Sequence, residues 1–380
     1  MNMNFFLYGY YGFGNLGDDL LLRALIENIT LYCESKFWVR SLNKGPSLGN
    51  NVIYTEVDKV ICDTKLNKVY RLLNYFREVL FYIKESDCII IGGGTLIHDS
   101  KSRWSLLIIF FIVVFSKLLR KQVVFIGIGI AALKYKSSYV ILNLITKLSA
   151  EFCVRDIEAE KILLKAKVSK KSFKVTADLA YSLTVLHEKL NKVKNNGNNG
   201  ISIGITIVDN ILNNNKMQQV IIEYISLLKG MNLKFKVHLI PFHTMCTDYK
   251  YSINDINVMR KIKNEILLEN IIIEENIGEN FSLIYKELDL VIGMRFHSLV
   301  LAEMYEIPFV GILHDNKIKG ICKSYNMPFI DIKDITAEML IIMSQNALKK
   351  KFPTNVNLDM VKKAKKNFDF LNKLCGRSKG

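Results

Sequence analysis

The sequence predicts an α/β protein of two Rossmann-like domains that face a cleft, followed by a C-terminal helix. Its 380 residues favour two domains, because a domain commonly holds roughly 150 residues. Half of the residues are apolar, which is enough for two cores. Short apolar runs also alternate with helical patterns in both halves of the chain, as in parallel sheets covered by helices.

Residues 1–187 form the first predicted domain. Its expected strands are Phe5–Gly9, Phe37–Leu42, Cys88–Ile91, Val123–Ile126 and Phe152–Val154. Its helical patterns include Asp18–Leu31, Val69–Lys84 and Tyr139–Ser149. Several of the strands are continuous apolar runs, which is typical of strands buried on both faces.

The segment 188–200, EKLNKVKNNGNNG, is polar and rich in Asn and Gly, so we expect a linker there. The alternation then restarts in a second predicted domain, residues 201–350. Its expected strands are Ile201–Val208, Lys234–Ile240, Ile271–Glu274, Leu290–Ile292 and Phe309–Ile312. Residues 351–380 are expected to form a basic helix, over about Leu358–Leu374, and a tail. This organisation predicts a GT-B-like architecture with the active site between the halves.

The strongest apolar run is Trp104–Leu119, WSLLIIFFIVVFSKLL. It is shorter than the roughly 20 apolar residues that a membrane-spanning helix needs, and Lys117 lies within it. We expect a buried core helix, and a helix lying in the membrane interface is the alternative.

The formal net charge is +16. Residues 349–380 contain ten basic and two acidic side chains, and such a tail suits anionic lipid, nucleic acid or an anionic substrate. A solvated helix face is the alternative. The seven cysteines are scattered without a C-x-x-C pair, which argues against disulfides and structural zinc and favours a reducing cytoplasm. The N-terminus has no signal-peptide pattern.

The first expected strand is followed by Gly12-x-Gly14-x-x-Gly17, the dinucleotide fingerprint in its strand–turn–helix context. That fingerprint also needs an acidic residue at the end of the next strand, where this chain has VRSLN at 39–43. Asp18 would moreover repel a pyrophosphate. A nicotinamide dehydrogenase is therefore disfavoured, and a carboxylate, a phosphate or a simple capped turn remain.

A second glycine motif, Gly92-Gly93-Gly94 with Asp99 five residues later, ends a buried strand. Ligands bind at that edge of an open parallel sheet, and Asp99 is placed to take a proton or to cap a helix. The remaining motifs, in chain order, are Gly127-x-Gly129, Arg155-Asp156, Asp178-Leu-Ala, Pro241-Phe-His243, Asp248, Gly293-Met-Arg295-Phe-His297 and His314-Asp-Asn-Lys317.

This ordered set resembles the polysaccharide pyruvyltransferase family, most closely its bacterial cell-wall members, over about residues 5–330. The start G-N-x-G-D, the G-G-G turn, R-D and G-M-R-x-H are specific in this order. Asp19 stands where Glu is usual, which keeps the charge. Phe296 stands where Leu is usual, which puts the shape of the pocket in doubt.

The resemblance implies an enzyme that transfers a pyruvyl group from phosphoenolpyruvate to two hydroxyls of a sugar, forming a ketal and releasing phosphate. It implies donor binding by Arg155, Arg295 and Lys317, because the donor carries a carboxylate and a phosphate and a guanidinium group binds two of their oxygens at once. His297 is the expected acid and Asp99 the expected base or hydroxyl anchor. Further expected substrate contacts are Gly14, Asn15, Asp18, Gly93, Gly94 and His243.

Each of these residues also has a structural interpretation. Arg155 can simply pair with Asp156, His297 can cap a helix, and Lys317 can be solvated. No spacing typical of metal ligands occurs, so we expect neither a metal nor a cofactor.

The expected acceptor is a surface glycan or a saccharide on a polyprenyl diphosphate, and nucleic acid is not expected. We expect a cytoplasmic protein, with peripheral contact to the anionic inner face of the membrane as a further hypothesis. The alternative functions are a GT-B glycosyltransferase that uses a nucleotide sugar and a non-catalytic partner in polysaccharide assembly, since fold does not fix function.

Overall fold

The computed structural model describes residues 2–62, 67–99, 104–183, 200–209, 214–244, 254–314, 316–350 and 354–376. The chain divides into two compact units. The first comprises residues 1–13, 18–184 and 358–380, and the second comprises residues 14–17 and 185–357. The expected linker at 188–200 lies outside the described residues except for Gly200.

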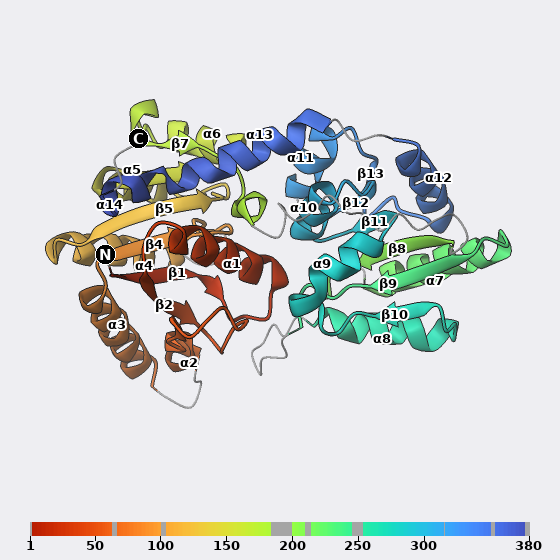
Figure 1. Cartoon of the computed structure of the whole chain (residues 1–380), viewed down its shortest axis with the longest axis horizontal. Helices are drawn as coiled ribbons and strands as arrows, with labels where there is room; N and C mark the ends of the chain where they lie inside the picture. Colours follow the sequence, from red (N-terminus) through yellow and green to blue (C-terminus); the bar gives the residue numbers. More distant parts are fainter. Residues whose placement is uncertain are drawn as a thin grey trace. The chain divides into compact units, whose positions relative to one another are not determined.

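The first unit is built on a seven-stranded sheet in which every pairing is parallel, in the order β3-β2-β1-β4-β5-β6-β7 (Figure 1). The strands are β1 Met3–Tyr11, β2 Ser35–Ser41, β3 Val52–Tyr54, β4 Cys88–Gly92, β5 Gln122–Ile128, β6 Glu151–Val154 and β7 Lys174–Val175. The five predicted strands are present. The two edge strands β3 and β7 were not predicted, because two or three residues are too few to show a pattern.

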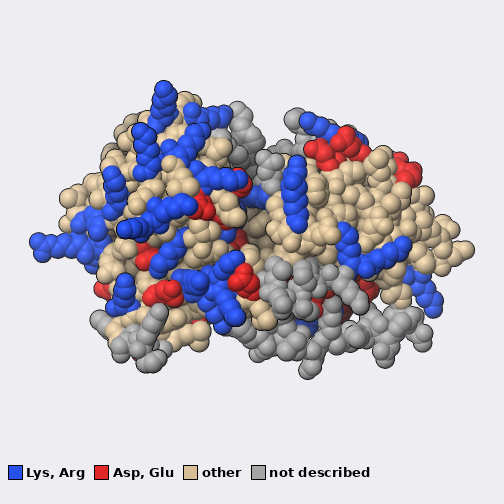
Figure 2. Space-filling model, turned by 90° about the horizontal axis from the view of Figure 1, so that it is seen from above, with Lys and Arg blue, Asp and Glu red and all other residues tan. Residues whose placement is uncertain are grey.

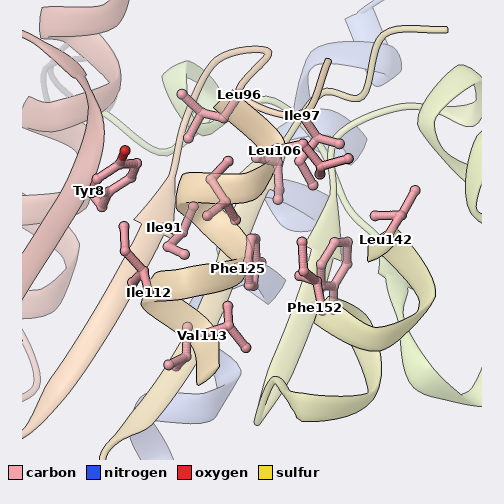
Figure 3. Packing of buried hydrophobic residues seen from close by; sticks show 14 of the residues in the cluster. Tyr8, Ile91, Leu96, Ile97, Leu106, Ile112, Val113, Phe125, Leu142 and Phe152 are labelled. Atoms are coloured by element: carbon pink, nitrogen blue, oxygen red, sulfur yellow. The ribbon is translucent and has the colours of Figure 1, made fainter. Parts of the chain in front are cut away.

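Helices α3 to α6 cover one face of this sheet. The helices of the unit are α1 Leu16–Thr30, α2 Val57–Cys62, α3 Lys68–Glu85, α4 Trp104–Leu118, α5 Lys136–Leu148 and α6 Ile157–Lys165. In the core beneath them, Ile91 of β4 and Phe125 of β5 meet Ile112 of α4 and Leu142 of α5 (Figure 3). Short strands alternating with helices thus give the parallel sheet that the pattern predicted.

The predicted core helix is present as α4. Its inner side is buried at Leu106, Ile109, Ile112, Val113 and Ser116. Its outer side is apolar as well, yet Trp104 and Leu118 are exposed. Among the described residues, no helix combines the length and the apolar character needed to cross a bilayer.

The C-terminal segment packs on the first unit from residue 358 onwards. It consists of α13 Thr354–Lys365, a 3-10 turn at Lys366–Phe368 and α14 Asp369–Leu374, where one helix was expected. The turn contains Asn367, a fully buried amide. Its Oδ1 accepts from the backbone N of Gly127 at 2.9 Å and from Oγ1 of Thr176 at 2.8 Å. Its Nδ2 donates to the carbonyls of Ala177 and Ala364.

The second unit is built on a six-stranded parallel sheet, in the order β10-β9-β8-β11-β12-β13. Its strands are β8 Ile201–Thr206, β9 Phe235–Leu239, β10 Ile271–Ile273, β11 Leu290–Gly293, β12 Phe309–Leu313 and β13 Phe329–Asp331. Its helices are α7 Asn214–Gly230, α8 Asp255–Ile266, α9 Ile277–Glu287, α10 Phe296–Met304, α11 Asn316–Ser324 and α12 Ala337–Leu348. Two Rossmann-like parallel sheets confirm the predicted α/β fold class.

Candidate active site

The strand order of each sheet reverses once, between β1 and β4 in the first unit and between β8 and β11 in the second. Loops at the carboxyl ends of strands diverge at such a reversal, and open α/β sheets bind their ligands there. The predicted site residues follow these strands or their neighbours in the two sheets.

Glycines shape the carboxyl edge of the first sheet. Gly12 after β1 and Gly93 and Gly94 after β4 have φ values of +70°, +70° and +72°, a region that other residues enter only at a cost. A Cβ on Gly94 would lie 3.1 Å from Oδ1 of Asp18. Asp18 and Gly94 therefore lie side by side in the first unit, and both were predicted to contact substrate.

Asp19, in the first turn of α1, was not among the predicted site residues. Burial, helped by the neighbouring charge of Asp18, raises the pKa of its carboxyl group to about 7 although a hydrogen bond from the backbone N of Gly12 at 3.4 Å opposes the shift. A carboxyl group with such a pKa gives or takes a proton readily near neutral pH. The signal in the sequence was a pair of acids directly after the glycine-rich turn.

Arg155 follows β6 and is held by protein partners. Its Nη1 donates to Oδ2 of Asp178 at 2.8 Å, its Nε lies 3.3 Å from Oδ2 of Asp156, and its Nη2 donates to Oγ1 of Thr95 at 3.2 Å. Its side chain is only 3% exposed. A Cβ on Gly129 would come within 3.0 Å of this guanidinium, so the G-x-G motif makes room for the arginine. Its donor-binding role stays a prediction, and the ion pairs match the structural interpretation.

Asp99 is almost fully buried, and its carboxylate accepts from the backbone N of Lys134 at 2.8 Å and of Tyr135 at 3.1 Å. Burial acts to raise its pKa, but these two hydrogen bonds and one from Ser138 outweigh burial and lower the pKa below its usual value. A carboxylate stabilised in this way is a weak base. These contacts fix the loop before α5, and the base role of Asp99 stays a prediction.

In the second unit, Arg295 follows β11 and directly precedes α10. Its Nη2 donates to Oδ1 of Asp255 at 2.6 Å and its Nε to Oδ2 at 3.2 Å. Asp255 is completely buried and also accepts from the backbone N of Asp209, Phe242 and His243. This two-pronged ion pair fixes the plane of the guanidinium group. Asp255 was missed, because nothing in a lone aspartate forty residues before Arg295 marks it as a partner.

Residues 14–17 of the glycine-rich turn pack on the second unit. The backbone N of Leu16 donates to the carbonyl of Phe242 at 2.9 Å, the N of Thr244 donates to the carbonyl of Gly14 at 3.0 Å, and Asn15 forms a β-bridge with His243. The side chain of Asn15 accepts from the backbone N of Gly17 at 3.0 Å. The turn is therefore capped as expected, and it places predicted substrate contacts beside His243.

The imidazole of His297 lies against Gly17. A Cβ on this glycine would lie 2.2 Å from Nδ1 of His297 and 2.8 Å from its Cγ. The ring of Phe296 lies edge-on to the imidazole, with centroids 5.2 Å apart. The histidine ring thus occupies the place that a side chain at Gly17 would fill.

Four predicted residues, Asn15, His243, Arg295 and His297, therefore gather at one edge of the second unit. Lys317 lies in the first turn of α11, at the carboxyl end of β12, and is half-buried. Asp248 lies outside the described residues. Across the described ranges, no group of three or more His, Cys, Asp or Glu side chains is arranged to hold a metal ion.

The sequence matches the family described as “Polysaccharide pyruvyl transferase” over residues 15–316. No curated protein matches the chain.

Among solved structures, the putative UDP-N-acetylglucosamine 2-epimerase from Listeria monocytogenes is 13% identical with a TM-score of 0.63, over 100% of this chain and 98% of its own. The UDP-GlcNAc 2-epimerase from Methanocaldococcus jannaschii is 12% identical with a TM-score of 0.61, over 98% and 100%. A glycosyltransferase from Rickettsia africae is 13% identical with a TM-score of 0.56, over 99% and 100%. At these identities the likeness shows a shared GT-B-like fold.

Proposed function

The chain belongs to the polysaccharide pyruvyl transferase family, and we propose that it transfers the pyruvyl group of phosphoenolpyruvate to two hydroxyls of a sugar. The sugar belongs to a cell-surface polysaccharide or to its lipid-linked precursor. The products are a pyruvate ketal and phosphate. The observation that carries this proposal is the cluster of Arg295, His297 and Asn15 at one edge of the second unit.

The donor has a carboxylate and a phosphate, so its site needs a cation with a fixed direction. Asp255 fixes Arg295 through Nε and Nη2, and the side chain of Arg295 keeps 17% of its surface exposed. A guanidinium group fixed in this way binds an oxyanion without first losing its own freedom. Lys317 of the same unit and Arg155 of the first unit are the further proposed donor-binding cations.

The chemistry requires one proton to move to the donor. Protonation of the methylene carbon of phosphoenolpyruvate makes it a methyl group and develops positive charge at the neighbouring carbon, which the first sugar hydroxyl attacks. Phosphate then leaves and takes with it the electron pair of its C–O bond. The second hydroxyl attacks the same carbon. The two hydroxyl protons balance the reaction, since one restores the acid and the other leaves on phosphate.

We assign the acid to His297, because an imidazole donates and accepts protons near neutral pH and its ring is packed between Gly17 and Phe296. A positioned acid contributes about 10²–10⁴-fold to the rate. In the first unit, Asp19 has a pKa of about 7, which suits removal of a hydroxyl proton better than the lowered pKa of Asp99.

The test incubates full-length protein with phosphoenolpyruvate and a panel of free and carrier-linked saccharides. Phosphate release and a saccharide mass increased by one pyruvyl group are the expected results. A parallel set with nucleotide sugars tests the glycosyltransferase alternative, and nucleotide release there without phosphate release from phosphoenolpyruvate would refute the proposal.

The variant His297→Gln checks the assigned acid. We expect turnover to fall by at least about 10²-fold, while the thermal midpoint stays near that of the wild type. The control is Lys323→Gln, an exposed change on α11 of the same unit, which should leave turnover unchanged. A folded His297→Gln protein with normal turnover would remove the histidine from the mechanism.

A further inference from the structure

Helices α3, α4 and α5 pack side by side on one face of the first sheet and expose large apolar side chains on their outward sides. We name these side chains the outer helix face. They are Val69, Tyr70, Leu73 and Phe81 of α3, Trp104, Leu107 and Leu118 of α4, and Tyr135, Val140 and Leu144 at α5, each between 39% and 71% exposed. Single exposed apolar residues are ordinary, but a group on adjacent helices marks an interaction surface.

The pattern along each helix is regular. Val69, Leu73 and Phe81 share one side of α3, while Val140 and Leu144 share one side of α5, because residues four or eight apart lie on the same side. Helix α4 is apolar on both sides, and Lys117 is its only charged residue. A helix that is apolar all round is normally covered all round, whereas Trp104, Leu107 and Leu118 of α4 stay exposed.

Charge on this face is mostly basic, since α4 and α5 contain no acidic residue and the two glutamates of α3, Glu78 and Glu85, are outnumbered by its four basic residues. The stretches 104–121 and 134–149, which include α4 and α5, contain six basic and no acidic residues, and Lys117, Lys136 and Lys147 among them are exposed. Figure 2 views the molecule from another side, and there too Lys and Arg side chains outnumber acidic ones over the first unit, at the left. An anionic partner therefore suits this unit.

Each of the three helices carries an exposed aromatic side chain at its start and a lysine in its last turn. Helix α3 leads into β4, α4 connects β4 to β5, and α5 connects β5 to β6. Because these strands are parallel, the three helices run in the same direction. Tyr70, Trp104 and Tyr135 lie at their first turns, whereas Lys84, Lys117 and Lys147 lie in their last turns. A bond of 2.9 Å from Nζ of Lys121 to the carbonyl of Lys84 joins the last turn of α3 to the end of α4.

We propose that the outer helix face binds the surface of an anionic lipid bilayer. Its apolar side chains would enter the boundary between headgroups and acyl chains, where Trp and Tyr are favoured, while its lysines meet anionic headgroups. A second copy of this chain fits less well, because a symmetric contact would bring like charges together. The proposal is independent of the reaction, since binding to lipid needs neither donor nor acceptor.

The experiment is co-sedimentation of the full-length protein with vesicles. One set contains phosphatidylcholine alone, and the other contains equal amounts of phosphatidylcholine and phosphatidylglycerol. We expect binding to the anionic vesicles, much weaker binding to the neutral ones, and a loss of binding as salt is raised. Equal binding to both sets, or binding to neither, would overturn the proposal.

Two variants separate the charged from the apolar contribution. Each basic residue near an anionic surface contributes roughly a fivefold gain in partitioning, so the triple change K117Q, K136Q and K147Q should weaken binding by about a hundredfold. The double change Leu107→Ser and Leu118→Ser should weaken it as well. The matched controls are K261Q and K323Q together, and Ile342→Ser, all exposed positions of the second unit, which should bind as the wild type does.

If the two surface variants bind vesicles as tightly as the wild type, the outer helix face is not the lipid-binding surface. Analytical ultracentrifugation tests whether a second copy of this chain covers the outer helix face instead. A wild-type dimer that Leu107→Ser and Leu118→Ser convert to a monomer, without any vesicle binding by the wild type, would assign the face to a second copy instead.

Discussion

Replacing Gly17 by alanine should displace the imidazole of His297. The added Cβ would lie 2.2 Å from Nδ1 and 3.0 Å from Cε1 of that ring, and non-bonded heavy atoms prefer a separation of about 3.5–4.0 Å. The ring must therefore retreat by roughly 1 Å or more. The backbone of Gly17 is not in the left-handed region, so alanine is acceptable there apart from this contact.

The expected cost falls on catalysis. A displacement of about 1 Å in a reacting group can lower turnover by about 10²-fold. The fold should survive, because alanine favours a helix over glycine by about 0.5–1 kcal/mol, which offsets part of the strain. The loss of turnover is measured as phosphate release with the acceptor identified from the saccharide panel. The stability of the fold is measured by thermal unfolding.

A matched control exists in the same chain. Gly278 is also the second residue of a helix, α9, and a Cβ there would meet nothing within 4 Å. Gly278→Ala should therefore keep normal turnover. In a protein that already carries His297→Gln, Gly17→Ala should cost little more, since both changes remove the same group. Normal turnover of Gly17→Ala alone, or full additivity of the two changes, would refute the reasoning.

Three further predictions concern buried polar groups. Asp255→Asn leaves the guanidinium of Arg295 without its ionic partner and should lower the free energy of unfolding by about 3–5 kcal/mol, as measured by urea titration; an unchanged midpoint would contradict the role given to Asp255. Burial raises the pKa of Asp19 from its ordinary 3.8 to about 7, so between these values the folded protein holds a proton that the unfolded chain has lost, and the free energy of unfolding falls as pH rises through that window. Asp19→Asn should flatten this part of the stability profile measured across the same pH range, and an unaltered slope would show that another group causes it. Asn367→Ala removes a buried amide with four hydrogen bonds and should cost about 2 kcal/mol or more, whereas Asn372→Ala, a partly exposed position in α14, should cost far less in the same urea titration.

Most strands of the two sheets were predictable because buried parallel strands are continuous apolar runs, whereas the short edge strands β3, β7 and β13 were missed. Cys88–Ile91 reads as such a run, and the structure gives β4 as Cys88–Gly92. Strand β7 escaped because Lys174 and Val175 are both exposed and have no apolar pattern. Length and periodicity also identified α4, although they did not reveal that Trp104, Leu107 and Leu118 stay exposed.

Contacts between distant residues were beyond a single sequence. The motif containing Arg295 and His297 was found from its residue types, yet its partners Asp255 and Gly17 lie far away along the chain. Asn367 is similar, because an asparagine in an amphipathic helix looks like a surface residue until the fold buries it. Ionic and hydrogen-bonded partners depend on tertiary structure, and spacing along the chain does not encode them.

Calorimetric titration of phosphoenolpyruvate into the full-length protein tests the central claim most directly. We expect binding to the wild type and binding weakened about tenfold or more by Arg295→Lys, because a lysine cannot form the paired hydrogen bonds. The control is Arg260→Lys, which changes a surface pair with Glu275 and should leave binding unchanged. Tight binding of UDP-N-acetylglucosamine with no binding of phosphoenolpyruvate, or full affinity in a folded Arg295→Lys protein, would contradict the claim.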